Sequence, residues 1–444
     1  MTRLIVDPLT RVEGHGRVEL LLKDGRLEDV RVRLLESPRL FEALVVGHRY
    51  DEVPDLICRI CAICSAVHKV TSLQALENAM CVIVPPLAAM LRELLVLGGH
   101  IQSHALHLFC LILPDLQGTP DVVALLRQGD PLAKAGLELK AFGNHIQQVA
   151  GGRVIHPINP VFGGVAYRPA ADALGSLAEE LSRWQRDWPE LAASFLQAGN
   201  YPHAGPVLGS AVATGLSNIF SLGGGGLWVE GEGELPAASY AKLLMEQARA
   251  DSYAKDAAGA SGPFLTGALA RARLSAQEGL AFGFPEDDTG IHANNAAQIR
   301  EIGRALQRVA QLLDTLLATD NDEPLQSDRK QSLGGGSGTA LMEAPRGLLV
   351  HHYVVDEWGT VVAADIVTPT AINQRVMAAQ VLADLAGEED PARLQDVTAR
   401  IIRAYDPCIS CAVHLVSIDR SPGEHAEGRS DGPEGVIGIK SSVF

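Results

Sequence analysis

The sequence has no excess of positive charge, since 37 Lys and Arg residues face 53 Asp and Glu residues for a formal net charge of −16. A chain this acidic does not hold a nucleic-acid backbone or an anionic membrane surface by bulk charge. It also lacks an uncharged apolar run of about 18 residues. The longest candidate, 106–113, stops at Pro114, so we expect no membrane span. Strand-like sequence begins at residue 3 and leaves no room for a signal peptide, which predicts a cytoplasmic protein.

Two glycine-rich stretches, 223–226 and 334–338, are expected to be loops. Neither is followed by the Lys-Ser/Thr pair that a phosphate-binding P-loop requires, and no internal repeat is present. Apolar residues are not scarce, because 47% of the 444 residues are hydrophobic and 20% are charged. This is the composition of a globular protein with a substantial core, and it excludes a disordered chain.

Apolar residues recur with helical spacing through most of the chain. The pattern predicts helices over 65–80, 87–113, 121–150, 170–199, 237–257, 294–318, 371–387 and 391–404, with Pro114 ending the second. Alternating patterns predict short strands over 3–35, around a turn at 23–26, and over 347–367, around a turn at 356–359. We therefore expect a mainly α (α+β) fold, a large helical core with small peripheral β-sheets, in a single domain over 1–414.

The last 30 residues, 415–444, differ from the rest, because 421–424 and 427–435 are polar, glycine-rich and charged. Tails of this composition are commonly disordered and open to proteases. The other interpretation is a segment that is removed during maturation. Residues 436–443 are apolar enough to dock as a strand, so composition alone leaves a retained tail possible.

Seven cysteines are present, and an odd count argues against a disulfide framework. Four of them form two pairs of identical spacing at opposite ends of the chain, Cys61-x-x-Cys64 and Cys408-x-x-Cys411. Together they offer four thiolates, a complete tetrahedral set for zinc, an iron–sulfur cluster, copper(I) or nickel. Spacing alone favours structural zinc, with a redox-active dithiol next, and does not name the metal.

Three cysteines fall outside the pairs. Cys81 and Cys110 stand in apolar, helical sequence, and we expect both to be inert core residues. Cys58 is three residues before Cys61, so a ligand role is the alternative to a place in the core.

Three histidines, His100, His104 and His107, lie on one face of the helix predicted over 87–113. Their spacing is compatible with a second transition-metal site. Because the helix is rich in apolar residues, we interpret them instead as buried hydrogen-bonding residues.

The residues around the two cysteine pairs are more specific than their spacing. The first pair stands in RICAICSAVH (59–68) and the second in DPCISCAVH (406–414). Both segments resemble the metal-binding motifs of the large, catalytic subunit of nickel–iron hydrogenases. RVEGH (11–15), EAPRG (343–347) and PTAIN (369–373) also match, in the family's order, over nearly the whole chain. The short motifs are most similar to the soluble cytoplasmic (group 3) enzymes, although Ala62 stands where many members have glycine.

The resemblance implies that the four paired cysteines hold a nickel–iron centre. Cys61 and Cys408 would bind nickel terminally, and Cys64 and Cys411 would bridge nickel and iron. The iron would carry carbonyl and cyanide ligands made by accessory proteins. Polarisable thiolates suit two metals held close together and a nickel ion that changes valence.

The resemblance also assigns residues around the metals. Glu13 matches a proton-relay glutamate, whose carboxyl group would take a proton from a terminal thiolate and pass it outward. Arg346 matches an arginine above the metal pair, where its charge would act electrostatically. Asp115 and Asp406 would orient that arginine; for Asp115 the alternative is a simple helix-end carboxylate. Thr370 would hydrogen-bond a diatomic ligand.

A magnesium site is implied as well. Glu42 matches a magnesium ligand, His414 is its partner, and a backbone carbonyl near Ile366 is a third. Magnesium prefers oxygen and keeps several waters, so the imidazole ligand follows from the family rather than from the chemistry.

The activity that the resemblance implies is reversible, heterolytic cleavage of H2 to protons and electrons, with Cys408 or Arg346 taking the first proton. The chain has no further cysteine cluster to carry electrons, so an iron–sulfur small subunit is required. A flavin- and NAD(P)-linked or deazaflavin-linked subunit is expected beyond it, and a maturation endopeptidase and nickel chaperones are expected for assembly. An H2 sensor and a tetrathiolate zinc protein are alternatives. A relative of the complex I quinone-site subunit is disfavoured because that subunit lacks the four cysteines.

Overall fold

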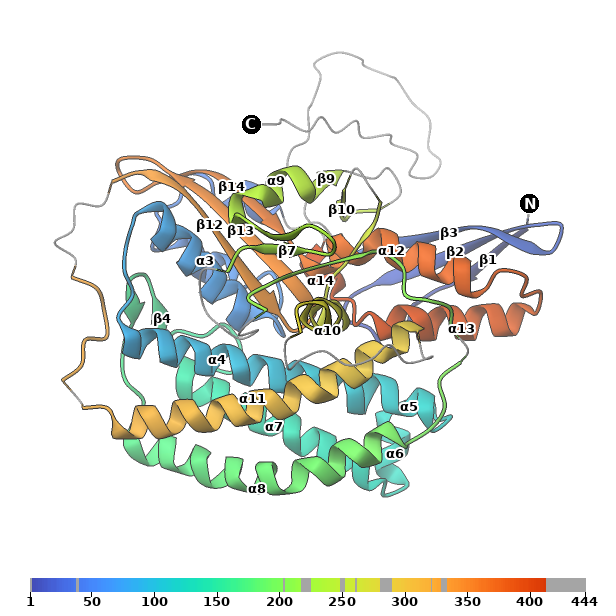
Figure 1. Cartoon of the computed structure of the whole chain (residues 1–444), viewed down its shortest axis with the longest axis horizontal. Helices are drawn as coiled ribbons and strands as arrows, with labels where there is room; N and C mark the ends of the chain where they lie inside the picture. Colours follow the sequence, from blue (N-terminus) through green and yellow to red (C-terminus); the bar gives the residue numbers. More distant parts are fainter. Residues whose placement is uncertain are drawn as a thin grey trace, which may run out of the picture.

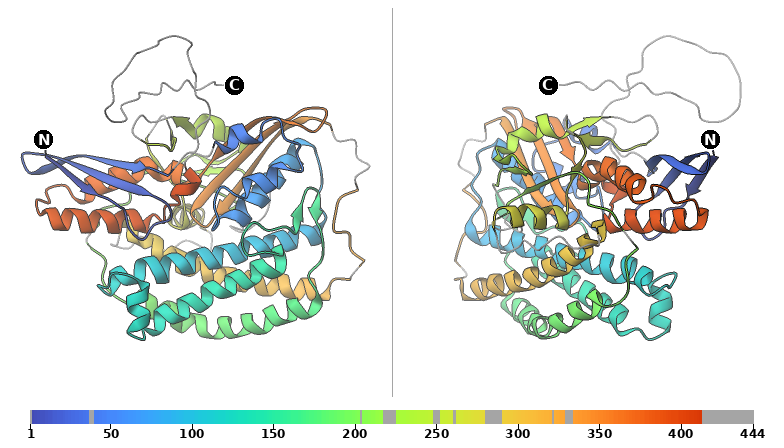
Figure 2. Two further views of the ribbon diagram at one scale, coloured as in Figure 1. Left: turned by 180° about the vertical axis from the view of Figure 1, so that it is seen from behind. Right: turned by 45° about the vertical axis from the view of Figure 1, so that its right-hand side comes forward.

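The computed structural model describes residues 2–36, 40–202, 204–216, 225–247, 252–259, 262–279, 290–320, 322–328 and 334–412 (Figure 1). Four long helices form its base: α4 (Pro86–Ala105), α7 (Pro131–Gly151), α8 (Ala171–Leu196) and α11 (Ala293–Ala318). Helix α4 packs on α7 and α11, and α8 packs on the same two helices, so the four enclose one apolar core (Figures 1 and 2). The bounds of α8 and α11 lie close to those predicted from helical periodicity, whereas the helix predicted over 121–150 is divided into α6 (Val122–Arg127) and α7.

Helix α4 does not end at Pro114 as expected. It continues through a π-helical stretch, η1 (Leu106–Ile112), into α5 (Leu113–Leu116). Pro114 lies in the first turn of α5, where a missing N–H needs no partner, so the chain runs two residues further. The continuous helix is long and apolar enough by composition to cross a membrane, but 89% of its most apolar window is buried inside the protein.

Two three-stranded antiparallel sheets flank the helices, and the alternating patterns predicted all of their strands except β12. One joins β1 (Thr2–Val6), β2 (Gly16–Lys23) and β3 (Arg26–Leu34), and the other joins β12 (Gly336–Ala344), β13 (Gly347–Val355) and β14 (Val361–Val367). Helix α3 (Ser65–Ala79) packs on β12 and β13. Residues 336–338, expected in a loop, belong to β12; a Cβ on Gly338 would lie 2.3 Å from the Ala75 carbonyl oxygen, so glycine permits this close approach.

The helix predicted over 237–257 is wrong. The structure has η2 (Ala237–Ser239) and α9 (Tyr240–Leu243), followed by the paired strands β9 (Met245–Gln247) and β10 (Asp256–Ala258). Tertiary contacts explain the difference, because Arg375 from α12 (Pro369–Asp384) binds the Asp256 carboxylate at 2.8 Å and Lys255 turns inward.

Shorter elements complete the described part of the chain. They are α1 (Phe41–Val45), α2 (Val53–Ile57), α6 (Val122–Arg127), β4 (Pro160–Val161), β5 (Gly164–Val165), β6 (Ser210–Thr214), β7 (Leu227–Val229), β8 (Gly233–Leu235), β11 (Phe264–Leu265), α10 (Ala268–Gln277), η3 (Gly290–His292), α13 (Pro391–Ala404) and α14 (Ile409–Ala412). The mainly α (α+β) expectation is confirmed, with a helical core and small sheets around it. Residues 413–444, which include His414 and the expected tail, lie outside the described residues.

Candidate metal centre

The two cysteine pairs meet in the interior of the protein. Cys61 and Cys64 stand just before α3, whereas Cys408 and Cys411 stand at α14, so the two ends of the described chain supply one site. The Cys408 sulfur lies 3.4 Å from that of Cys61, 4.0 Å from that of Cys64 and 2.7 Å from that of Cys411. All four sulfurs lie within 4.8 Å of one another and are buried.

The pKa values of the four sulfurs bear on which kind of metal the site can bind. Burial, followed by the neighbouring sulfurs, raises the pKa of Cys408 well above its usual range, and burial does the same for the pKa of Cys411. Hydrogen bonds with Cys408 lower the pKa values of Cys61 and Cys64. Four thiolates buried this close together repel one another, so the group is suited to binding a cation among them. The donor set fits a soft, multivalent metal centre.

Cys58 is not part of this group. Its Sγ donates to the Asp55 carbonyl oxygen at 3.3 Å, and burial raises the pKa of its thiol. Cys110 is buried as predicted, and burial raises its pKa to about 11. The prediction for Cys81 is wrong: it is exposed, because α3 ends at Ala79 and the chain turns outward with a left-handed φ of 54° at Cys81.

Glu13 joins the N-terminal segment to the second cysteine pair. Its backbone forms a β-bridge with Cys408, and its carbonyl oxygen accepts from the Ile409 N–H at 3.0 Å. The Glu13 carboxylate accepts from the Ser410 N–H at 3.0 Å and lies 3.2 Å from the Cys408 sulfur. Because Glu13 is only half-buried, its carboxyl group lies between the buried Cys408 sulfur and the protein surface.

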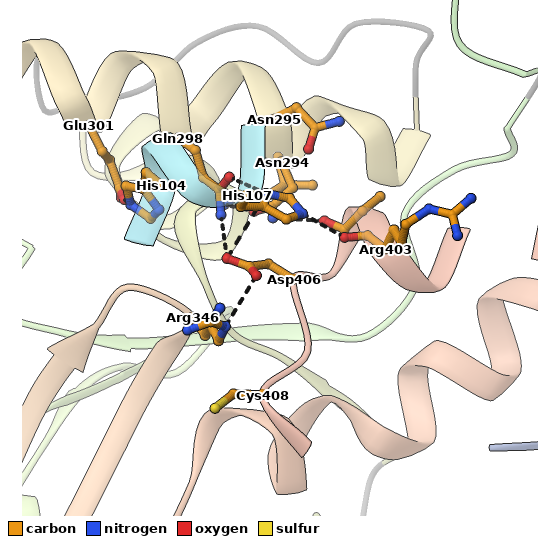
Figure 3. A network of polar contacts seen from close by, with 12 residues as sticks. His104, His107, Asn294, Asn295, Gln298, Glu301, Arg346, Arg403, Asp406 and Cys408 are labelled. Atoms are coloured by element: carbon orange, nitrogen blue, oxygen red, sulfur yellow. Dashed lines mark hydrogen bonds and ion pairs between the residues drawn. The ribbon is translucent and has the colours of Figure 1, made fainter. Parts of the chain in front are cut away.

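Arg346 covers the other side of the cysteines. It occupies the two-residue turn between β12 and β13, and its Nη1 lies 3.4 Å from the Cys64 sulfur. Its Nε donates to the Asp406 carboxylate at 3.1 Å (Figure 3). Burial alone would lower the pKa of Arg346, but Asp406 and the cysteine sulfurs raise it well above its usual range. Burial would likewise raise the pKa of Asp406, but Arg346 holds it below its usual value.

Asp115 does not orient Arg346 as expected. Its carboxylate accepts from Arg403 Nε at 2.7 Å and Nη2 at 3.0 Å, and it also pairs with Arg11. Asp115 stands in the last turn of the α4–η1–α5 helix, where two arginines compensate its charge. It therefore anchors α13 and the N-terminal segment, and of the two expected aspartates only Asp406 reaches Arg346.

Thr370 lies at the start of α12 and is buried. Its hydroxyl oxygen accepts from the Cys408 N–H at 2.9 Å, which leaves the hydroxyl proton for another acceptor. The residue is therefore placed beside the cysteines, with a donor to offer there.

Glu42 is buried away from the cysteines in a group of carboxylates. Lys255 Nζ lies 3.3 and 3.2 Å from its two oxygens, and the Ile366 N–H donates to it at 2.9 Å. The carboxylates of Glu42, Glu246 and Asp365 have oxygens within 4.8 Å of one another. Burial raises the pKa of Glu42, and it raises the pKa of Glu246 to about 8. This oxygen-rich, acidic donor set is of the kind magnesium prefers, although Lys255 already neutralises part of its charge.

The three helix histidines are buried hydrogen-bonding residues, as interpreted. His100 lies 3.0 Å from the Glu343 carbonyl oxygen, and His104 lies 2.9 Å from the Glu301 carboxylate. His100, His104 and Glu301 have the spacing of a metal site, but Arg271 donates to Glu301 from Nε at 2.6 Å and from Nη2 at 2.7 Å. The Arg271 guanidinium therefore already pairs with the Glu301 carboxylate that a metal would need as a ligand.

Several buried charges behind the site have no signal in the sequence. Arg271 pairs with Glu343 as well as Glu301, and Lys255 pairs with Glu42 and Glu246. Lys255 and Glu246 are nine residues apart, but the other three pairs join residues 30 to 213 positions apart, which periodicity and local motifs cannot reveal. Only Glu343 stands inside a segment, 343–347, that the resemblance singled out.

Comparisons with known proteins agree with this site. The family described as nickel-dependent hydrogenase matches residues 39–133 and 289–414, and a family described as HoxL-like matches residues 3–36. The alpha subunit of sulfhydrogenase 2 from Pyrococcus furiosus is 37% identical over 93% of this chain and 99% of its own length. One subunit of the vhu F420-non-reducing hydrogenase of Methanocaldococcus jannaschii is 30% identical over 85% of this chain and 97% of its own length.

Solved structures show the same architecture. A chain of an NAD+-reducing [NiFe]-hydrogenase in the H2-reduced state superposes with a TM-score of 0.81 at 27% identity, covering 93% of this chain and 100% of that one. The Ni-Fe-Se hydrogenase of Desulfomicrobium baculatum shares the fold, with a TM-score of 0.73 at 22% identity over 93% of this chain and 100% of that one. With four buried cysteines drawn together from both ends of such a fold, the chain belongs to the nickel-dependent hydrogenase family and is the catalytic large subunit of a nickel–iron hydrogenase.

Proposed function

We propose that the chain cleaves H2 reversibly at a nickel–iron pair held by its four paired cysteines, and that the electrons pass to an iron–sulfur partner subunit. Cys61 and Cys408 would hold nickel, and Cys64 and Cys411 would be shared between nickel and iron, as the family resemblance implies. When bound, the metal pair polarises H2 and takes up its electrons. The observation that carries the proposal is the group of four buried sulfurs within 4.8 Å, contacted by a carboxylate on one side and a guanidinium on the other.

The chain's own residues move the proton. The Cys408 sulfur accepts it from H2, and the Glu13 carboxylate, 3.2 Å away, takes it next. The Ser410 N–H holds that carboxylate in place at 3.0 Å. Arg346 fixes a positive charge beside the Cys64 sulfur, and Thr370, beside Cys408, would offer its hydroxyl proton to an iron-bound ligand.

Metal analysis tests this proposal. Mature protein should contain nickel and iron at about one each, with infrared bands from iron-bound CO and CN. Replacing any of the four cysteines by Ser should abolish nickel binding and activity, because a hydroxyl stays protonated and binds soft metals poorly. The matched control is Cys58→Ser, three residues from the first pair, which can keep the hydrogen bond to Asp55 and should retain nickel. Stoichiometric zinc without nickel would end the proposal.

Magnesium is proposed at the acidic group around Glu42, with the backbone carbonyl of Ile366 and His414 as the further ligands that the family resemblance implies. The support is the group of three carboxylates there, of which Glu42 is buried and Glu246 and Asp365 are half-buried. Magnesium content should fall in Glu42→Gln while the nickel content is retained. A variant with unchanged magnesium would remove Glu42 from the ligand set.

The same proposal includes partner subunits and the removal of the C-terminal residues 415–444. The relatives are each named as one subunit of a hydrogenase, which supports a multi-subunit assembly, and we propose the cytoplasm as its compartment. We expect it to contain an iron–sulfur subunit, with a flavin- and NAD(P)-linked or deazaflavin-linked subunit beyond it.

The family match ends at residue 414, which supports removal of residues 415–444 by an endopeptidase after nickel chaperones have delivered the metal. Until that cleavage, Cys408 and Cys411 stay open to the incoming metals.

A further inference from the structure

Asp406 is held from two sides inside the protein. Its Oδ1 accepts from Arg346 Nε at 3.1 Å, and its Oδ2 accepts from Gln298 Nε2 at 3.2 Å (Figure 3). Behind Gln298 lies His107, whose Nδ1 is 2.6 Å from Gln298 Oε1 and whose Nε2 is 2.7 Å from the Arg403 carbonyl oxygen. The contacts join η1, α11 and α13, and all of these residues are buried.

The hydrogen bonds determine where the protons of His107 are. A carbonyl oxygen only accepts, so the nitrogen facing Arg403, Nε2, must carry a proton. The Gln298 amide must turn its NH2 group toward Asp406, because the reverse orientation would set its oxygen against a carboxylate oxygen. Its own oxygen then faces His107 Nδ1, and that nitrogen must carry a proton as well. Every group in the network is satisfied only if both ring nitrogens of His107 donate.

We propose that His107 is an imidazolium and a positioning residue, the second cation that holds Asp406 against Arg346. Its Nδ1 lies 4.0 Å from Asp406 Oδ2, so the carboxylate stands between two positive groups. The other charged groups nearby have their own partners. Glu301, on α11, is bound by Arg271 and His104, and the Arg403 guanidinium points to Asp115.

The same histidine also holds the backbone that leads to the metal site. The Arg403 carbonyl oxygen, in the last turn of α13, accepts from both His107 and the Asp406 N–H, the latter at 2.8 Å. A positive side chain at a helix C-terminus is favourable because the exposed carbonyls carry partial negative charge. Asp406 then adopts a left-handed φ of 52°, two residues before Cys408. His107 therefore fixes both the side chain and the backbone of Asp406.

The protonation state is tested by NMR on the full chain labelled with 15N-histidine. Both ring nitrogens of His107 should carry a proton at pH 7, with the signals assigned by their loss in His107→Gln. His104 is the matched control: it lies on the same helix, is equally buried, and offers one nitrogen to Glu301 while the other has no hydrogen-bond partner. It should show a single protonated nitrogen. A bare nitrogen on His107 at pH 7 would overturn the proposal.

The positioning role rests on the proposed function and is tested separately on nickel-loaded enzyme. His107→Gln is neutral and donates from its amide nitrogen alone, so it leaves one of the two acceptor oxygens without a donor; it should keep nickel while losing activity by about tenfold in kcat, with little change in KM for H2. The infrared bands of the iron-bound ligands should shift, because Arg346 moves with Asp406. Unchanged kcat and unchanged bands would refute the positioning role. A protein that lacks nickel but shows a doubly protonated His107 would refute the proposed function and leave the protonation inference standing.

Discussion

Replacing Arg346 by Lys is the sharpest probe of the site, because it keeps a positive charge and removes only the planar fork. In the structure the guanidinium spans two groups at once, donating from Nε to Asp406 at 3.1 Å and from Nη1 to the Cys64 sulfur at 3.4 Å. A lysine ammonium is a single point charge on a flexible stem and satisfies one of these two positions. The variant therefore loses one charge-assisted hydrogen bond in a buried site.

The size of the effect follows from that loss. A hydrogen bond to a charged group is worth about 1.5–3 kcal/mol. Since about 1.36 kcal/mol corresponds to a tenfold change in rate, turnover should fall by roughly 10- to 160-fold. We expect a loss of about 10²-fold in turnover per bound nickel, the size found when one preorganised electrostatic contact is removed.

The assay is H2 oxidation with an artificial electron acceptor, normalised to nickel content. Arg92→Lys is the matched control, because Arg92 is equally buried and binds Glu77 through two nitrogens at 2.8 and 2.7 Å, within the α3–α4 packing. It should lower stability and leave turnover per nickel unchanged. Arg346→Lys within about twofold of wild type, or an equal loss in both variants, would show that Arg346 does not act at the metals.

Three further predictions follow from the structure. Glu13→Gln keeps an acceptor for the Ser410 N–H, but its side chain cannot take up a proton. The variant should therefore lower H2 oxidation and H/D exchange by about 10²-fold or more, while para/ortho-hydrogen conversion persists. Normal H/D exchange in this variant would mean that the proton leaves by another route. Burial lowers the pKa of His292 to about 4, below its unfolded value of about 6.5. The unfolded chain therefore binds more protons between those pH values, the free energy of unfolding falls as pH drops from 6.5 to 4, and His292→Gln should flatten that slope in denaturant titrations. The intact mass of active enzyme should end at His414, and active enzyme that retains Phe444 would show that the tail is not removed.

Local sequence determined most of the long helices, the β1–β2–β3 sheet and the β13–β14 hairpin. Helical periodicity located α3, α8, α11 and α13 to within a few residues, and α8, α11 and α13 each bury one stripe whose pattern is written along a single segment. The helix predicted over 121–150 is divided into α6 and α7. The turn residues at 23–26 likewise placed the β2–β3 hairpin. The motifs around the two cysteine pairs also identified the family, since metal ligands and their neighbours are chemically constrained wherever the chain brings them.

Tertiary structure decided what those patterns could not contain. The segment 237–257 forms strands because Asp256 pairs with Arg375 and Lys255 pairs with Glu42. Both partners lie outside the segment, so its own sequence does not reveal them. The sequence allows Asp115 to be interpreted as a partner of Arg346. In the fold, its carboxylate pairs with Arg403 instead.

The network behind Arg346 shows the same limit at the site itself. Gln298, His107 and Asp406 come from three segments spread over about 300 residues, and nothing local to any of them indicates the other two. A histidine's role depends on which atoms face its two nitrogens, and packing sets those atoms. The sequence therefore singled out the four cysteines that the fold brings together, and the fold decided which charges surround them.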